Sequence, residues 1–370
     1  MKFHKRLKGK IEIRPKFKLN HSNLKLAYTP GVAKVAQKID ENPKSCLDYT
    51  SKANNVAIIT NGSRTIGVGN TIAEASLPVM EGKSVLFKCL AGIDAYPLCL
   101  STKSVKEIVR TIEILAPTFS AFNIEDIESP KCFEIMEQLA RKKIMAFHDD
   151  QQGAAVVVLA GLLNALKVMK KDLKKVKICL AGAGAAGYGT FKILKEMKVK
   201  NLVALDVHGI IYRWRKQDNK YFKEIARFSN PFNLRGGLEK AIKDADVFIG
   251  LTGQAGLLKS SHVSLMNERP IVFSLSNPVP EILPNEIKKV KKDHLYATGR
   301  SDLPNQINNA LVFPRILRAM LDSQKNINIK LEVKIAKAVA GLVKKPNKKK
   351  ILPDLFDKRL DKVILKQFQV

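Results

Sequence analysis

An apolar strand pattern runs directly into a glycine-rich turn at Lys177-Ile178-Cys179-Leu180-Ala181-Gly182-Ala183-Gly184-Ala185-Ala186-Gly187. A lone G-x-G-x-x-G is a weak signal. Here a strand pattern precedes it, a helical pattern follows it, and Asp206 ends the next strand pattern, 19 residues after Gly187. This context predicts a Rossmann-like dinucleotide-binding domain, built as a doubly wound parallel sheet.

Each small residue of this turn has an expected role toward a dinucleotide. Gly182 permits the tight turn, Gly184 lets backbone N–H groups approach a pyrophosphate, and Gly187 lets the helix pack closely on the strand. Ala185 and Ala186 open the helix, whose N-terminus favours a phosphate. We therefore expect all five residues to bind the cofactor.

The residues after the next strand bear on the choice between NAD and NADP. Asp206 can accept hydrogen bonds from both ribose hydroxyls and would repel a 2′-phosphate, which favours NAD. His208, Arg213 and Arg215 follow closely, and a cation there can hold a 2′-phosphate. NAD is therefore expected, with NADP as the alternative.

Acidic residues gather in two further segments, Asn123-Ile124-Glu125-Asp126 and His148-Asp149-Asp150-Gln151-Gln152-Gly153. Each segment follows a short buried strand pattern, so both acidic pairs are expected at the sheet edge where open α/β folds bind ligands. Any one of these residues alone could cap a helix or face solvent. As a set, their oxygens suit a hard divalent cation such as Mg²⁺ or Mn²⁺.

Length and composition describe a soluble globular chain. Its 370 residues favour two domains, and its hydrophobic fraction of 45% is ordinary. We find no apolar run near the ~20 residues that span a bilayer, and no secretory signal. The five cysteines form no C-x-x-C pair, so reduced thiols in a cytoplasmic protein are expected and a zinc site is not.

The formal charge of +30 raises the possibility of a polyanion partner. The excess is mostly lysine, however, spread along the whole chain, whereas specific phosphate and base contacts favour arginine. The densest basic run, residues 344–350, is expected to be an exposed loop. A basic polyanion-binding protein with a relic fold is therefore kept only as an alternative of another class, and nucleic acid is not an expected partner.

Periodicity divides the chain into an α/β fold of two domains and a tail. Residues 1–152 are expected to form an amino-terminal α/β substrate and metal domain, residues 153–325 the dinucleotide-binding domain, and residues 326–370 a lysine-rich helical segment. Residues 1–20 predict an extended arm. Strands are expected at residues 55–62, 84–90, 96–100, 120–124, 144–147, 177–181, 201–206, 246–250 and 270–277, and helices at 104–116, 130–142 and 153–169.

Six motifs in order resemble the short prokaryotic malic enzymes, from about Phe3 to Asp322. They are Tyr28-Thr29-Pro30-Gly31-Val32-Ala33, Met80-Glu81-Gly82-Lys83-Ser84-Val85-Leu86-Phe87-Lys88, Ile124-Glu125-Asp126, Phe147-His148-Asp149-Asp150-Gln151, Ser276-Asn277-Pro278 and Gly299-Arg300-Ser301-Asp302-Leu303-Pro304-Asn305-Gln306-Ile307-Asn308-Asn309. The resemblance implies oxidation of L-malate by NAD(P)⁺ and decarboxylation to pyruvate and CO₂, with Mg²⁺ or Mn²⁺.

The resemblance also implies the proton-transfer and metal-binding residues. Lys83 matches the base that takes the C2 hydroxyl proton, Tyr28 matches the acid that protonates C3 of enolpyruvate, and Asp149 matches the neighbour that tunes the lysine or relays its proton. Without the motifs, Lys83 would be an ordinary lysine and Tyr28 a turn residue packed on Pro30. The implied metal ligands are Glu125, Asp126 and Asp150.

Three further residues are implied as contacts of the substrate. Asn277 and Asn309 match substrate-binding amides, Asn277 also on the cofactor side, and Arg64 stands where a carboxylate-binding arginine is expected. A homodimer or larger homo-oligomer is implied, with the amino-terminal arm as an exchange element and no membrane partner. A malolactic-type enzyme or an oxaloacetate decarboxylase on the same site remains an alternative.

The sequence also departs from the family pattern at three places. Gln152 and Ala154 replace the commoner histidine and threonine, Leu251-Thr252-Gly253-Gln254-Ala255-Gly256 is an unusual cofactor-side loop, and Arg315 replaces a glycine. None of these changes removes a proposed metal ligand or proton-transfer group. We expect them to affect efficiency and cofactor choice more than the reaction.

Overall fold

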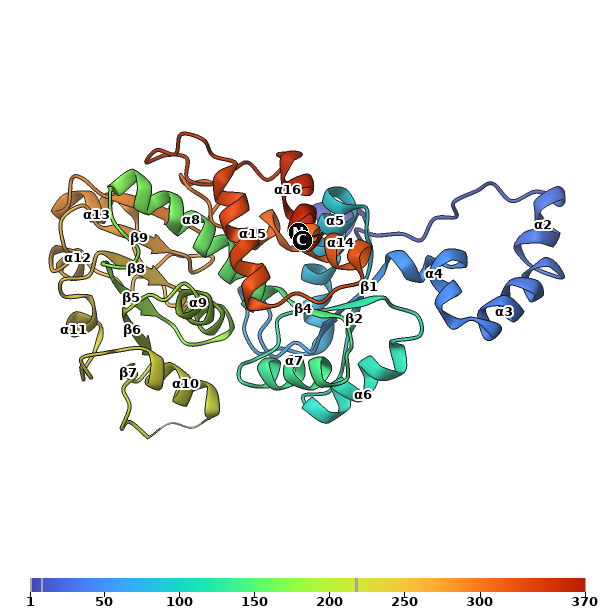
Figure 1. Cartoon of the computed structure of the whole chain (residues 1–370), viewed down its shortest axis with the longest axis horizontal. Helices are drawn as coiled ribbons and strands as arrows, with labels where there is room; N and C mark the ends of the chain where they lie inside the picture. Colours follow the sequence, from blue (N-terminus) through green and yellow to red (C-terminus); the bar gives the residue numbers. More distant parts are fainter. Residues whose placement is uncertain (1, 8, 217–218, 370) are drawn as a thin grey trace.

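The computed structural model describes residues 2–7, 9–216 and 219–369, which form two sheets flanked by helices (Figure 1); all strand pairs are parallel except the antiparallel pair β6–β7. The first sheet has the strand order β2-β1-β3-β4, with β1 Asn55–Thr60, β2 Asp94–Cys99, β3 Ala121–Ile124 and β4 Ala146–His148. The second has the order β10-β9-β8-β5-β6-β7, with β5 Lys177–Ala181, β6 Asn201–Asp206, β7 Gly209–Ile210, β8 Val247–Gly250, β9 Ile271–Ser274 and β10 Leu295–Thr298. The α/β fold and the Rossmann-like sheet are confirmed.

The segment expected as a strand at residues 84–90 is wrong, because it lies inside α5, Leu77–Ala91. The helix has Pro78 in its first turn and ends at Gly92, whose φ of +66° suits a left-handed cap. Its buried residues are Met80, Lys83, Ser84 and Phe87. Their spacing is helical, so tertiary packing overrides the short apolar run. As a result Lys83 points into the core.

Helices α6 Val105–Leu115 and α7 Lys131–Arg141 form as predicted beside the first sheet. A π-helical turn, η4 Asp149–Gly153, then leads into α8 Ala154–Met169, which packs against α9, Ala185–Glu196. Residues 149–169 are long and apolar enough to cross a membrane by length and composition, contrary to our expectation. Since 72% of the tested window is buried, we interpret this stretch as a core helix.

The second sheet and its flanking region contain strands and helices that we did not predict from the sequence. These are the hairpin strand β7, strand β10, and helices α10 Lys220–Phe228, α11 Leu238–Ile242, α12 Ser260–Ser264 and α13 Pro284–Val290. The central strands β5, β8 and β9 are buried almost throughout, as parallel strands covered on both faces should be.

The last helices pack against elements of both halves of the chain. Helix α14, Phe313–Ser323, follows η5 Asn309–Leu311 and packs on α5 and on α16, Arg359–Phe368, while α15, Ile329–Gly341, packs on α8. Arg315 is buried and donates to Asp361 Oδ1 at 2.7 Å, to the Leu355 carbonyl oxygen at 2.9 Å and to that of Leu311 at 3.2 Å. This departure from the family pattern therefore pins the C-terminal segment.

The amino-terminal arm carries helices α2 and α3 away from both sheets (Figure 1). It contains α1 Lys2–Leu7, α2 His21–Ala27, α3 Gly31–Glu41, η1 Pro43–Ser45, α4 Cys46–Tyr49 and η2 Ser51–Asn54, so the extended form expected for residues 1–20 begins only after α1. Near its start, Lys10 N donates to Glu81 Oε2 of α5 at 3.2 Å. Apolar side chains remain exposed along it, including Ile13 at 88% and Leu26 at 70%.

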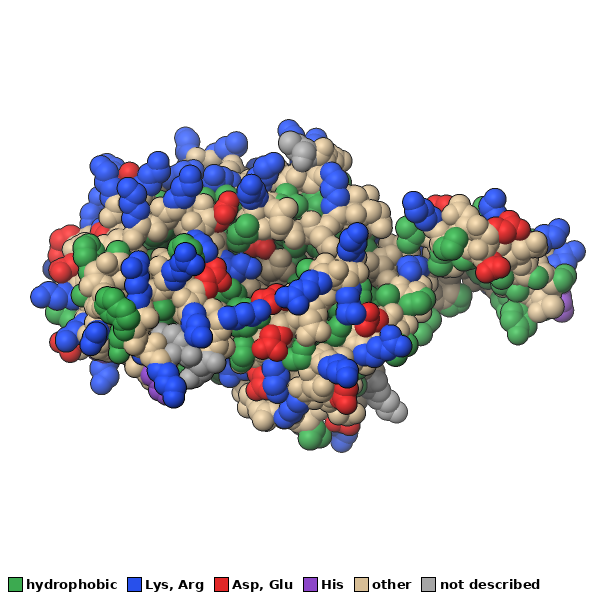
Figure 2. Space-filling model, turned by 60° about the horizontal axis from the view of Figure 1, so that its bottom comes forward, with side chains coloured by type: hydrophobic (Ala, Val, Ile, Leu, Met, Phe, Trp, Pro, Cys, Tyr) green, Lys and Arg blue, Asp and Glu red, His purple; other side chains and the backbone are tan. Residues whose placement is uncertain are grey.

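The distribution of basic side chains and the state of the cysteines match what we expected from the sequence. On the face in Figure 2, lysine and arginine side chains scatter over the whole surface instead of gathering in one stripe. All five cysteines are free. Neither observation points to a polyanion interface.

Candidate active site

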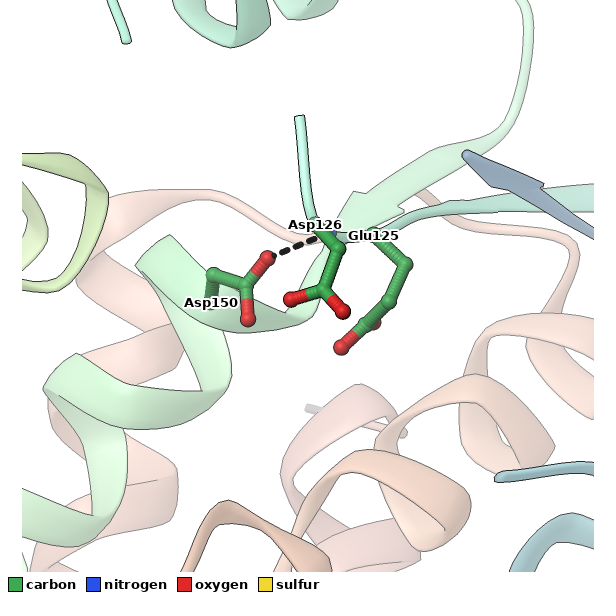
Figure 3. Close-up of side chains that lie close together, drawn as sticks. All are labelled: Glu125, Asp126 and Asp150. Atoms are coloured by element: carbon green, nitrogen blue, oxygen red, sulfur yellow. Dashed lines mark hydrogen bonds between the residues drawn. The ribbon is translucent and has the colours of Figure 1, made fainter. Parts of the chain in front are cut away.

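Two neighbouring strands deliver the three predicted metal ligands to one place. Glu125 and Asp126 follow β3, Asp150 follows β4, and these strands pair in parallel. Each residue offers a carboxylate oxygen, and the three oxygens lie within 4.8 Å of one another. Figure 3 shows the carboxylates converging. Three buried or half-buried carboxylates at this spacing fit a divalent cation such as Mg²⁺ or Mn²⁺.

The Asp126 backbone adopts a conformation that few residues other than glycine favour. Its φ of +50° lies in the left-handed region. Three hydrogen bonds hold it there: its N–H donates to Asp150 Oδ2 at 2.8 Å, its carbonyl oxygen accepts from Arg64 N at 3.0 Å, and its Oδ2 accepts from Ile66 N at 3.1 Å. The surrounding chain therefore fixes the orientation of this carboxylate.

Lys83 and Asp149 meet beside the acidic cluster. The Lys83 ammonium forms ion pairs with Glu125, at 2.5 Å, and with Asp149. Asp149 Oδ2 also accepts from Asn309 Nδ2 at 2.7 Å, while Asp149 Oδ1 is buried without a hydrogen-bond partner. The Lys83 ammonium also lies 4.3 Å from the centroid of the Phe313 ring. The base expected from the sequence is thus held between two carboxylates and an aromatic ring.

Burial and crowding shift the pKa values of these groups. Burial, reinforced by Asp150, raises the pKa of Glu125 and brings that of Asp126 to about 7. Burial also raises the pKa of Asp149 to about 6, with Lys83 opposing the rise. For Lys83, burial alone would lower the pKa, but the carboxylates of Asp149, Glu125 and Asp150 outweigh it and raise it. A site that crowds this many carboxylates favours bound cations.

The glycine-rich turn fits a dinucleotide pyrophosphate. Gly182 has a φ of +103°, and a Cβ there would lie 2.4 Å from the Leu251 carbonyl oxygen. At Gly184 a Cβ would meet only Ser129 Oγ, at 3.9 Å, so the space in front of the turn is open. No side chain caps the first turn of α9, which begins at Ala185. Its free N–H groups can therefore donate hydrogen bonds to a phosphate.

A cavity of about 860 Å³ connects the acidic cluster with the glycine-rich turn. Its lining includes Asp126, Asp150, Gly184, Ala185 and Ala186, and the predicted substrate residues Arg64, Asn277 and Asn309. Arg64 comes within 3.4 Å of where a Cβ on Gly253 would lie, so it reaches across to the cofactor-side loop. The volume suits a dinucleotide with a small substrate.

The other predicted site residues are not part of this cavity lining: Tyr28, Lys83, Glu125, Asp149, Gly182, Gly187 and Asp206. Asp206 ends β6 next to the glycine-rich turn, where Gly182 N donates to the Leu205 carbonyl oxygen at 2.9 Å. Tyr28 is 70% exposed at the end of α2, and the structure does not bring it to Lys83. One chain therefore brings the expected base next to the expected metal ligands, but not the expected acid.

The structure adds residues that the sequence did not single out. Glu281 is fully buried and accepts from Thr252 N at 3.1 Å, Ser276 N at 3.1 Å and Ser274 Oγ at 3.0 Å. It thereby ties the loops after β8 and β9 together. Asn123 Nδ2 donates to Glu125 Oε2 at 2.8 Å. Asn123 lies two residues from a predicted ligand, and that proximity was the only available signal.

The Gln152 departure is accommodated within the π-helical turn. Gln152 Oε1 accepts from His148 N at 3.0 Å, and its Nε2 donates to Glu332 Oε1 of α15 at 2.8 Å. Burial raises the pKa of Glu332. Helix α15 of the C-terminal segment therefore stabilises the turn that carries Asp149 and Asp150.

Comparison with known proteins matches both halves of the chain. A family model described as the malic enzyme N-terminal domain matches residues 8–140, and one described as the malic enzyme NAD-binding domain matches residues 151–363. The NAD-dependent malic enzyme of Geobacillus stearothermophilus is 44% identical over 95% of this chain and 74% of its own length.

Two further proteins are similarly close. The bifunctional malic/malolactic enzyme of Bacillus subtilis (strain 168) is 43% identical over 98% of this chain and 90% of its own length. The crystal structure of the NAD-dependent malic enzyme from Thermotoga maritima superposes with a TM-score of 0.95 at 41% identity, covering 100% of this chain and 98% of that one.

Proposed function

The chain belongs to the malic enzyme family, and from this premise we propose which of its residues perform the reaction. The protein oxidises L-malate and decarboxylates it to pyruvate and CO₂ while reducing NAD⁺ or NADP⁺. The alternatives of a malolactic enzyme, an oxaloacetate decarboxylase or a polyanion-binding protein are not favoured. The observation that carries the assignment is that Asp126 and Asp150 of the acidic cluster line the same cavity as the glycine-rich turn, while Lys83 is buried in ion pairs with Glu125 and Asp149 beside that cluster.

Glu125, Asp126 and Asp150 would hold Mg²⁺ or Mn²⁺. When bound, such an ion supplies Lewis acidity at the C2 oxygen of the substrate, where negative charge develops as CO₂ leaves. The carboxylate of Asp126, held by the Ile66 N–H, and that of Asp150, held by the Asp126 N–H, are oriented in advance. Neither side chain needs to reorganise for this role.

Lys83 is the proposed base for the C2 hydroxyl. Its Nζ lies against Asp149 Oδ2, so that carboxylate is placed to exchange a proton with it. The carboxylates around Lys83 raise the pKa of its ammonium, and a divalent cation held by Glu125, Asp126 and Asp150 would offset that rise and favour the neutral amine that a base requires. Asn309 donates to the same carboxylate and so positions it, besides its proposed contact with the substrate. This arrangement gives Asp149 a proton-relay role.

Substrate and cofactor are bound from opposite walls of the cavity. Arg64 can clamp a malate carboxylate with its guanidinium fork, and Asn277 can donate from the loop after β9. The N–H groups at the start of α9 bind the pyrophosphate, and Asp206 binds the adenosine ribose. NAD⁺ held by these groups would supply the hydride acceptor for C2 of malate.

Tyr28 is the proposed acid for C3, supplied by the partner subunit of a homodimer. In one chain the residue is 70% exposed, and its helix α2 packs against α3 on the projecting arm. The exposed apolar side chains of the arm are surface that a second copy would bury. We also propose a cytoplasmic location and the domain boundaries 1–152, 153–325 and 326–370.

The direct test is a steady-state assay of the purified chain with L-malate and Mn²⁺. NAD⁺ and NADP⁺ are supplied in parallel, reduction is followed spectroscopically, and pyruvate and lactate are measured separately. We expect nicotinamide reduction matched mole for mole by pyruvate. Release of lactate without net reduction, or no malate consumption, would overturn the assignment.

A further inference from the structure

The carboxylate of Asp206 is already occupied by an arginine. Arg215 Nη1 donates to Asp206 Oδ1 at 2.9 Å and Nη2 donates to Oδ2, which makes a two-pronged pair. The Arg215 and Asp206 side chains are only 15% and 10% exposed. His208 N donates to Asp206 Oδ1 at 2.8 Å, and Arg215 Nη1 lies 3.3 Å from the carbonyl oxygens of Gly209 and Ile210. The β6–β7 hairpin thus builds this pair into the fold.

The Arg215 pair changes the charge that a cofactor contacts at the end of β6. A free carboxylate accepts the ribose hydroxyls of NAD⁺ and repels the 2′-phosphate of NADP⁺. Here the guanidinium cancels that charge at bonding distance. A carboxylate has about four acceptor positions, and three are used in this structure, so one remains for a hydroxyl.

The surroundings are also cationic. Arg213, Lys223 and Arg227 line a hollow of about 290 Å³, and none of the three forms an ion pair with residues 2–7, 9–216 or 219–369. Arg213 lies two residues before Arg215 on the same loop.

We propose that Arg215 sets cofactor choice by neutralising Asp206, so that one site accepts both NAD⁺ and NADP⁺. The inference rests on the proposed contact of Asp206 with the adenosine ribose. It gives the two residues opposite effects: Asp206 favours NAD⁺, and Arg215 removes the penalty on the 2′-phosphate.

The test is equilibrium binding of NAD⁺ and NADP⁺ by titration calorimetry, without malate or metal. The single tryptophan, Trp214, stands next to Arg215 and provides a second, fluorescent readout. Arg215→Gln should weaken NADP⁺ by about 10- to 100-fold, the usual worth of a charge-assisted contact, and NAD⁺ by less than about threefold. Arg215→Lys, which keeps the charge, should keep most of the NADP⁺ affinity.

A double variant separates neutralisation from direct contact. In Asp206→Asn/Arg215→Gln both charges are gone, so NADP⁺ affinity should recover to near the wild-type value. Persistent weakness toward NADP⁺ in that variant would overturn the proposal in favour of direct phosphate contact. Equal weakening of both cofactors by Arg215→Gln would overturn it in favour of a bracing role for the hairpin.

Two controls make the result specific. Arg359 forms a similar two-pronged pair with Asp357 at a distance of two residues, and it is not part of the cavity lining, so Arg359→Gln should leave both affinities unchanged. Asp206→Asn alone should weaken NAD⁺. If it does not, the ribose assignment of Asp206 fails, whatever Arg215 does.

Discussion

The buried cluster around Lys83 and the arm that carries Tyr28 are built by opposite means. Lys83 is 9% exposed and sits between two carboxylates and an aromatic ring, in a site fixed by strand ends and a π-helical turn. Tyr28 is 70% exposed on a segment that packs mainly on itself (Figure 1). The contrast teaches that one chain buries the proposed base next to the proposed metal ligands, while the proposed acid stays on the surface.

The largest effect should come from the metal side of the cluster. Asp150→Ala removes a proposed ligand and the acceptor of the Asp126 N–H, so Mn²⁺-dependent turnover should fall below detection while the circular dichroism spectrum stays unchanged. Glu128→Ala is the matched control, since Glu128 lines the same cavity but pairs with Lys131 at 2.8 Å. Near-normal Mn²⁺ binding and turnover in Asp150→Ala would remove this residue from the metal site.

Loss of Lys83 should cost both chemistry and stability. Lys83→Ala should slow malate oxidation by about 10²–10⁴-fold, with part of the rate restored by added methylamine. The metal-free protein should lose up to about 3–5 kcal/mol of unfolding free energy, because Glu125 and Asp149 lose their buried cation.

Lys88→Ala, on the same helix but in an exposed ion pair with Asp94, should change neither quantity by much. If Lys83→Ala kept full activity, another group would have to be the base.

A change at Tyr28, on the arm, should reduce activity without reducing stability. Tyr28→Phe deletes one hydroxyl from a mostly exposed ring, so the unfolding free energy should stay within about 0.5 kcal/mol of wild type. The rate of pyruvate formation should nevertheless fall by about 10²–10⁴-fold. A variant with ordinary turnover would leave Tyr28 with only a structural role in its turn.

The smallest effect concerns the brace behind the π-helical turn. Burial raises the pKa of Glu332, so the folded state holds its proton to higher pH than the unfolded state, and stability is lost as pH rises above the ordinary glutamate value of about 4.3. Glu332→Gln removes this loss and keeps an acceptor for Gln152. Its unfolding midpoint should exceed wild type by roughly 2–4 °C at pH 8 and by nothing near pH 4. A constant difference across pH would contradict the ionisation argument.

Much of the cluster followed from sequence because its parts lie at strand ends. Glu125, Asp126 and Asp150 each follow a short apolar strand, and adjacent parallel strands bring such ends together. The geometry of Lys83 did not follow, because its helix α5 contains an apolar run that also reads as a strand. Lys83 points inward because it lies on the buried face of helix α5, and the structure was needed to show that this segment is a helix.

Other features depend on chain reversals and distant contacts that no local pattern encodes. The pairing of Asp206 with Arg215 needs the β6–β7 hairpin, and Glu281 reaches back to the loop after β8. The position of Tyr28 depends on how α2 and α3 leave the domain, which the local sequence does not determine.

The most direct test of the account is an activity measurement on mixed dimers purified through two different affinity tags. A dimer of one Lys83→Ala chain and one Tyr28→Phe chain should have about half the wild-type malate turnover, because one site receives intact Lys83 and the partner's intact Tyr28. A dimer of wild type with a chain carrying both changes should be inactive. If the first dimer is inactive and the second is half active, Tyr28 serves its own chain and the account is contradicted.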